Sequence, residues 1–95
     1  MAIFCMIGKY DRNSLAEASG KRTREAENLI ARYQGTVKSM YALLGQNDLI
    51  MIVDLPSVED AMKVSIGLTK LTGIAFVTSP AMPVSDFDAF SEVGQ

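Results

Sequence analysis

The chain has 95 residues, of which 48% are hydrophobic and none is histidine, and its 9 basic and 11 acidic side chains give a net charge of −2. This length predicts a single domain, and the near balance of charge argues against a dedicated nucleic-acid-binding protein, which needs a basic face. The lack of histidine removes the commonest general base and the commonest metal ligand, so we expect no metal site and no cofactor. Cys5 is the only cysteine, which excludes an intramolecular disulfide.

The N-terminal segment predicts a buried strand. Residues 2–9 are mostly apolar and include strand-favouring types such as Ile3, Phe4 and Ile7. The apolar start lacks a positively charged leading region and is too short for a signal peptide or a membrane span. We therefore expect a cytoplasmic protein that does not associate with membranes.

The next segment predicts a helix that begins near Ser14. Ser14 and Glu17 have the spacing of a capping box, in which the serine is the N-cap. Ser19 and Gly20 interrupt the helical pattern, which indicates either two helical pieces or a close approach of another backbone. The helix is expected to end at Gln34-Gly35, with Gly35 as a left-handed C-terminal cap.

Two strands follow, over residues 36–44 and 48–55, joined by the turn Gly45-Gln46-Asn47-Asp48. Because the two runs are close in sequence, antiparallel pairing through a tight hairpin is expected. Strict alternation would place Val37, Ser39 and Tyr41 on one face of the first of these strands. The second strand is apolar on both faces and ends at Pro56.

The last third of the chain predicts a helix, a strand and a short terminal helix. Ser57 is the expected N-cap of the helix, and Gly73 ends it. The strand over residues 74–79 is expected to stop at Pro80, and residues 85–90 are expected to form the terminal helix. The last thirteen residues carry three acidic side chains and no basic one, so residues 83–95 form an acidic tail beyond a domain over residues 1–82.

The order βαββαβ predicts an α+β, ferredoxin-like fold with a four-stranded antiparallel sheet and two helices on one face. The other sheet face has no covering segment in so short a chain, and the strand composition predicts that this face is apolar. Monomers rarely expose such a patch. We therefore expect a homodimer, or a higher oligomer built from dimers, that packs through this face.

The chain resembles the GYD domain family over roughly residues 3–82. In that family the naming motif ends in Gly-Tyr-Asp or Gly-x-Tyr-Asp; here Gly45 and Asp48 match, and Asn47 occupies the tyrosine position. The resemblance implies a dimeric α/β barrel and no generally agreed activity. It is carried by three segments, which are Gly8-Lys9-Tyr10, Ser19-Gly20-Lys21-Arg22-x-Arg24-Glu25-Ala26, and Gly45-Gln46-Asn47-Asp48 with the strand that follows it.

The chain is also loosely similar to the effector-binding domains of Lrp/AsnC-type regulators. The similarity consists of the βαββαβ order and a Gly-x-x-Asp turn before the third strand. It would imply binding of a small molecule between subunits, but no helix-turn-helix segment precedes the first strand here.

Five residues are candidates for ligand binding: Tyr10, Arg22, Arg24, Tyr41 and Asp48. The tyrosines could donate hydrogen bonds into a pocket, and the arginines beside Ser19-Gly20 could hold an anionic group. Each has an ordinary alternative: core packing for the tyrosines, local ion pairs with Glu25 and Glu27 for the basic cluster Lys21-Arg22-Thr23-Arg24, and acceptance of backbone hydrogen bonds in the turn for Asp48. No combination of residues predicts a catalytic site.

Three functions remain open. The first is a homo-oligomeric small-molecule-binding or regulatory module with an apolar site between sheets, whose ligand would be a small apolar or anionic metabolite. The second is a cofactor-independent monooxygenase or isomerase of the dimeric α/β-barrel kind. The third is a structural assembly module without a ligand. The tail, through Phe87 and Phe90, is expected to dock on a neighbouring surface.

Overall fold

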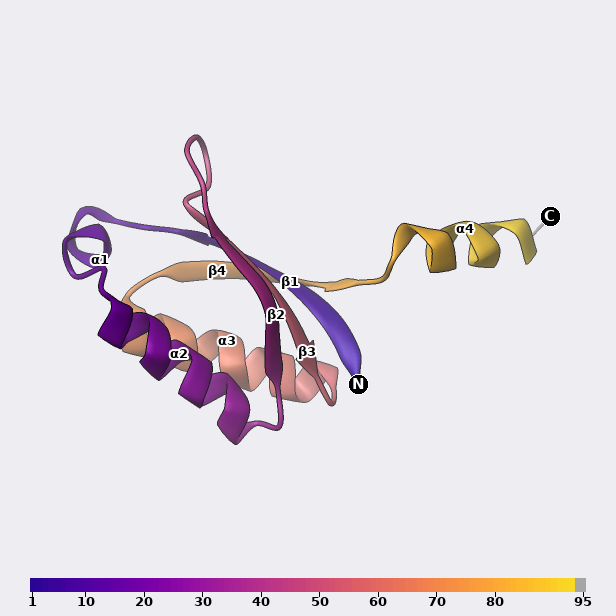
Figure 1. Ribbon diagram of the computed structural model, residues 1–95, viewed down its shortest axis with the longest axis horizontal. Coiled ribbons are helices and arrows are strands. Elements are labelled where there is room, and N and C mark those ends of the chain that lie inside the picture. The colour runs from indigo at the N-terminus through magenta and orange to yellow at the C-terminus, as the bar shows by residue number, and fades with distance from the viewer. Residues whose placement is uncertain (94–95) are drawn as a thin grey trace.

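The computed structural model describes residues 1–93, without the side chains of Ser14 and Val93, and contains one four-stranded antiparallel sheet (Figure 1). The strands lie in the order β2-β3-β1-β4, and α2 and α3 lie on one face of the sheet. This is the α+β, ferredoxin-like fold that the sequence predicts. The elements in chain order are β1 (Ala2–Lys9), α1 (Arg12–Ala16), α2 (Gly20–Arg32), β2 (Thr36–Ala42), β3 (Leu49–Leu55), α3 (Val58–Thr72), β4 (Ala75–Ala81) and α4 (Val84–Val93).

Alternate residues of the two central strands supply the sheet side of the core. In β1 and β3 every second side chain is buried, as expected for strands with one face against helices. Full burial of one such side chain contributes about 1.5–3 kcal/mol to stability. The fully buried side chains from the sheet and the two helices are Phe4, Met6, Ile30, Met51, Val53, Leu55, Val64 and Leu68.

The edge strand β2 contains an irregularity that the sequence pattern does not predict. Val37 pairs with Val53 and Ser39 pairs with Ile52, so the register shifts between Val37 and Ser39. A bulge of this kind places one extra residue in the strand and reverses the alternation beyond it. Val37 therefore packs on the core while Tyr41 lies on the opposite face, and the expected strict alternation is wrong.

The first helical region consists of two separate helices. Ser14 lies inside the short α1, so its expected role as an N-cap is wrong. Instead Ser19 is the N-cap of α2, with extended backbone angles and a side-chain oxygen that accepts a hydrogen bond from the Arg22 backbone N–H at 3.1 Å. The interruption at Ser19-Gly20 thus marks the start of the second helix, one of the two readings that the sequence allows.

At the C-terminal end of α2, Gly35 is not the left-handed cap that the sequence predicts. The left-handed residue is Gln34, at φ 65°, and not Gly35. Gly35 is required for another reason, because a Cβ atom there would lie 2.5 Å from Leu55 Cδ2 and 2.8 Å from Ile30 Cγ2. The chain therefore passes against the core at this point, and only glycine leaves room.

Both expected caps of α3 are confirmed. The Ser57 hydroxyl accepts a hydrogen bond from the Asp60 backbone N–H at 3.1 Å and donates one to the Asp60 carboxylate at 2.7 Å. At the other end Gly73 is left-handed, at φ 75°, and its N–H donates to the Thr69 carbonyl. Such caps satisfy backbone groups that a helix end leaves unpaired.

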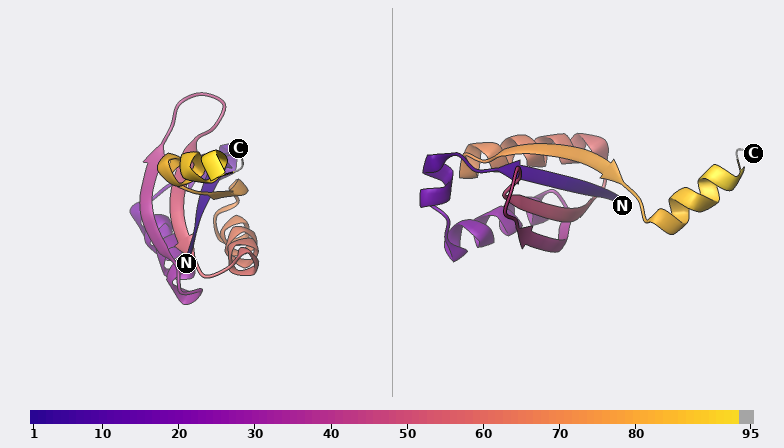
Figure 2. Two further views of the ribbon diagram at one scale, coloured as in Figure 1. Left: turned by 90° about the vertical axis from the view of Figure 1, so that its right-hand side faces the viewer. Right: turned by 90° about the horizontal axis from the view of Figure 1, so that it is seen from above.

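The C-terminal part departs from the expectation in two ways. Pro80 lies inside β4 instead of ending it, which is tolerated because β4 is an edge strand with one side free of ladder hydrogen bonds. The terminal helix is longer than expected, Val84–Val93, and it projects away from both layers (Figures 1 and 2). Val84, Phe87 and Phe90 on it are exposed.

Candidate functional site

Asp48 ties the hairpin to the end of β1. Its carboxylate accepts a hydrogen bond from the Tyr10 backbone N–H at 2.8 Å, and its own N–H donates to the Gly8 carbonyl at 3.0 Å. Its carbonyl accepts a third bond from the Leu43 N–H at 2.8 Å. The carboxylate thus accepts a backbone hydrogen bond, as the ordinary interpretation holds, but the donor belongs to the segment after β1 and not to the turn.

Tyr10 and Arg22 meet at one end of the layer between the sheet and the helices. The Arg22 guanidinium carbon lies 5.7 Å from the centroid of the Tyr10 ring, within the range of a cation–π interaction. Both side chains are half-buried. They line a cavity of about 50 Å³ together with Thr23, Ala26, Met40, Leu49, Met51, Leu68, Thr72, Ile74 and Phe76.

This cavity is small for a metabolite. A water molecule takes up about 30 Å³ of liquid, and pockets for small ligands are about 300–1,000 Å³. Its one buried polar side chain, Thr72, donates to the Leu68 carbonyl at 2.7 Å and accepts from the Ile74 N–H at 3.0 Å. Because these bonds satisfy Thr72, the cavity offers an entering molecule polar partners only at Tyr10, Arg22 and Thr23.

The other two predicted site residues lie elsewhere. Arg24 is exposed on α2 and does not line the cavity. Tyr41 is 64% exposed and pairs with Ile50 on the sheet face opposite the helices. The structure therefore brings together Tyr10, Arg22 and Asp48 and separates them from Arg24 and Tyr41. Within the basic cluster, Lys21 and Glu25 form the expected local ion pair at 4.0 Å.

The sheet face opposite the helices carries mostly apolar side chains, and we call it the open face. The strand register arranges it in three rows. The central row has one bulky side chain, Ile52, among the smaller Cys5, Ser39 and Ser79. The outer rows consist of Tyr41, Ile50, Ile7 and Val77, and of Thr36, Asp54, Ile3 and Ala81.

Charge lies at the borders of the open face, with Lys9 beside Ala75 at one end and the Lys38–Asp54 pair at the other. The Lys38 ammonium lies 3.5 Å from the Asp54 carboxylate, and Lys38 stands at the bulge of β2. The pair is partly exposed, so it contributes little to stability. The centre of the open face therefore has no charged side chain that would favour its exposure to solvent.

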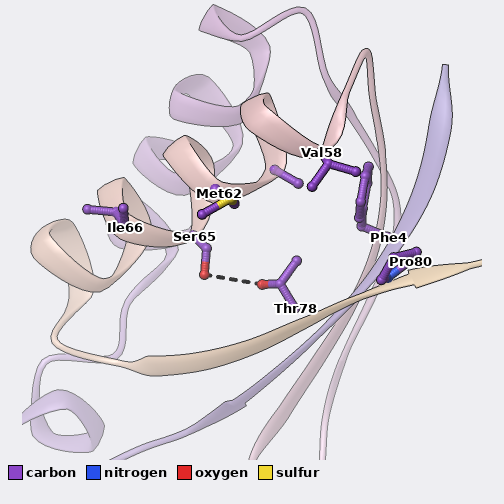
Figure 3. A pocket seen from close by; sticks show the side chains of 8 residues that line it. Phe4, Val58, Met62, Ser65, Ile66, Thr78 and Pro80 are labelled. Atoms are coloured by element: carbon purple, nitrogen blue, oxygen red, sulfur yellow. Dashed lines mark hydrogen bonds between the residues drawn. The ribbon is translucent and has the colours of Figure 1, made fainter.

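A second hollow, which we call the α3–β4 groove, was not predicted from the sequence (Figure 3). It has a volume of about 300 Å³ and opens between α3 and β4, and a hydrogen bond of 3.2 Å from Thr78 to the Ser65 hydroxyl crosses it. The sequence signal is the apolar width of α3, which exceeds the part that contacts the core. The groove is lined by Phe4, Val58, Ala61, Met62, Ser65, Ile66, Thr78 and Pro80.

The described residues form neither a metal-binding cluster nor a membrane-spanning helix. Among residues 1–93, no group of three histidine, cysteine, aspartate or glutamate side chains is placed to hold a metal ion. Within the same part of the chain, no helix has the length and apolar character needed to cross a membrane.

Comparison with known proteins gives a family. No curated protein matches the chain. A family model described as GYD domain matches residues 4–90, from within β1 into α4. The match extends beyond the segment 3–82 on which the resemblance was noted, and it includes Phe87 and Phe90. With nearly the whole sequence matched, the chain belongs to the GYD domain family.

Proposed function

We propose that this protein is a homodimer that packs through the open faces of its two sheets and binds a small, largely apolar molecule between them. The observation that carries the proposal is the composition of the open face. Ile3, Cys5, Ile7, Ile50 and Ile52 form a contiguous apolar surface on the two central strands. A second copy placed across this surface would remove it from water, which is the dominant favourable term in protein association.

The row pattern supports a ligand between the sheets. Two sheets pack face to face at about 10 Å, and bulky side chains from both fill the layer. The central row offers only Ile52 as a bulky group, beside Cys5, Ser39 and Ser79. Two such rows facing each other would leave room in the middle of the interface.

The borders of that space would supply the polar contacts. Tyr41, with its side chain 64% exposed, stands at one edge of the open face, and its hydroxyl can donate or accept a hydrogen bond. Lys38, paired with Asp54 at 3.5 Å, stands along the same edge strand and could pair with an anionic group. The proposed ligand is therefore an apolar molecule with one polar or anionic end.

A substitution at the centre of the open face tests the assembly. Ile52→Lys would place a charge in the proposed interface, so it should separate the two open faces and halve the mass of the assembly, while the circular dichroism spectrum stays that of the parent protein. The matched control is Leu15→Lys, on the exposed helix α1, which should leave the dimer intact. A parent protein that is already monomeric at tens of micromolar would contradict the proposal.

Native mass spectrometry of freshly purified protein tests the ligand. We expect a dimer that carries a reproducible added mass, which is released when Ile52→Lys separates the subunits. Ligand binding would be contradicted by a dimer that carries no added mass and whose melting temperature is not raised by added apolar carboxylates. This result would not contradict the dimer itself.

A further inference from the structure

We propose that α4 of one molecule docks into the α3–β4 groove of a second copy, and that the second molecule returns its own α4 in the same way. This exchange uses surfaces other than the open face and does not depend on the sheet-to-sheet dimer. The donor and the acceptor surface lie on the same chain, so a twofold axis closes the arrangement.

The donor surface is one stripe of α4. Val84, Phe87 and Phe90 are spaced three residues apart and so lie along one side of the helix. They are 73%, 57% and 76% exposed, although aromatic side chains usually bury most of their area. Figures 1 and 2 show that this helix projects from the body, and the exposure of its stripe means that no other segment among residues 1–93 covers it.

The acceptor surface matches the stripe in chemistry and length. On the groove wall formed by α3, Val58, Met62 and Ile66 are 58%, 61% and 57% exposed. Figure 3 shows these side chains along the groove, above Thr78 and Pro80 of β4. At 1.5 Å per residue the stripe on α4 is about 9 Å long and the wall about 12 Å, so one helix can cover the groove.

The connection between β4 and α4 favours a second copy over the groove of the same chain. Only Met82 and Pro83 separate the two elements. The Pro83 carbonyl accepts hydrogen bonds from the N–H groups of Asp86 at 3.0 Å and Phe87 at 3.1 Å, and the proline ring fixes its own φ angle. This short, constrained link holds α4 pointing outward, whereas docking on its own α3 would require the chain to reverse here.

The position of Pro80 makes the exchange geometrically simple. Pro80 lines the α3–β4 groove, and it also lines a hollow of about 400 Å³ at the root of α4, with Ala81, Met82, Val84 and Phe87. The groove therefore begins next to the root of α4. When the N-terminal ends of two α4 helices meet at a twofold axis, each helix enters the groove of the other copy. It enters at the end of the groove that Val58 lines and runs along α3.

Charge in the C-terminal half of α3 favours the same pairing, whereas the first turn of α3 is itself acidic, with Glu59 and Asp60. Residues 83–95 contain three acidic side chains and no basic one, whereas residues 1–82 contain nine basic and eight acidic side chains. On α3, Lys63 and Lys70 are exposed, and Lys70 lies in the last turn. With Val84 near Val58, the acidic end of α4 at Glu92 falls beside the lysine-bearing half of α3.

Cross-linking between chains tests the exchange. Cys5 is first replaced by serine in the full-length protein, so that the introduced cysteines are the only ones. A chain with Phe87→Cys is then mixed with a chain with Met62→Cys and oxidised mildly. We expect a mixed disulfide at least tenfold faster than in the matched control, where Leu15→Cys on α1, which is 59% exposed, replaces Met62→Cys.

Two outcomes would overturn the proposal. The first is a rate equal to that of the control pair. The second is a disulfide that forms within one chain carrying both cysteines and never between chains, which would mean that α4 folds back on its own groove. Glu92→Lys should slow the mixed disulfide about two- to fivefold, and Lys70→Glu on the other chain should restore the rate, because exposed ion pairs contribute at that scale.

The exchange and the sheet-to-sheet dimer can fail separately. In the Ile52→Lys background the mixed disulfide should form at an unchanged rate, since α4 and its groove lie away from the open face. If the mixed disulfide does not form in the parent background while the dimer is retained, the exchange of α4 is contradicted and the sheet-to-sheet dimer is not.

Discussion

Tyr10 and Asp48 are joined by a hydrogen bond of 2.8 Å from the Tyr10 backbone N–H to the Asp48 carboxylate. The bond connects residues 38 positions apart and fixes the base of the hairpin to the end of β1. The same carboxylate keeps Tyr10 in place beneath the Arg22 guanidinium. Asp48, one of the two residues that match the naming motif of the family, thus has a structural role.

Asp48→Ala should lower the free energy of unfolding by about 1–3 kcal/mol, because it removes a charged acceptor and leaves a partly buried N–H without a partner. Urea denaturation measures the change. Asn47→Ala, at an exposed position in the same turn, is the control and should change stability by less than about 0.5 kcal/mol. Equal effects of the two variants would contradict the role assigned to Asp48.

Gly35→Ala should destabilise the fold by about 1–3 kcal/mol, because the added Cβ would overpack the core against Leu55 and Ile30. Gly20→Ala is the matched control. A Cβ there meets only the end of the Arg24 side chain, at 3.4 Å, and alanine favours a helix more than glycine does. Thermal melts should place the first variant below the parent protein and the second at or above it. The reverse order would show that the chain does not pass against the core at residue 35.

Much of the fold could be predicted from the sequence because its signals are local. The apolar runs of β1 and β3 and the caps at Ser57 and Gly73 depend on residues close in the chain, and the structure confirms them. The N-cap at Ser19 was missed because Ser14, with Glu17 three residues later, has the stronger capping pattern. The choice depends on where the chain leaves β1, which is a tertiary property.

The candidate site was harder to predict for a related reason. Because of the bulge between Val37 and Ser39, Tyr41 faces away from the helices. No residue type at this place in the sequence predicts a bulge. The meeting of Tyr10, Arg22 and Asp48 depends on how β1, the hairpin and α2 pack. The open face, by contrast, was predicted as apolar, because strands β1 and β3 have apolar residues at almost every position.

Labelling of Cys5 probes the open face at its centre. Cys5 lies between Ile52 and Ser79 in the central row. In a sheet-to-sheet dimer a bulky maleimide should react with its thiol at least tenfold more slowly than in the Ile52→Lys protein, in which the open faces are separated. The Leu15→Lys protein should react at the slow parent rate. Equal rates in all three proteins would mean that the open face is accessible in the parent protein.

Removal of residues 84–95 should leave the sheet and the helices α2 and α3 folded, because α4 projects from them. The circular dichroism spectrum should lose only the contribution of one ten-residue helix. Association should weaken, since the deletion removes the exposed stripe of Val84, Phe87 and Phe90. Dilution experiments followed by light scattering measure this, and an unchanged oligomer with an unchanged melting temperature would contradict a docking role for the tail.

The central claim is that a second copy covers the open face, and sedimentation equilibrium of the full-length protein tests it most directly. The chain has a mass of 10.3 kDa. We expect the measured mass at micromolar concentration to be twice that value or an even multiple of it, falling to a lower multiple in Ile52→Lys. A mass of one chain for the parent protein across the whole concentration range would contradict the account.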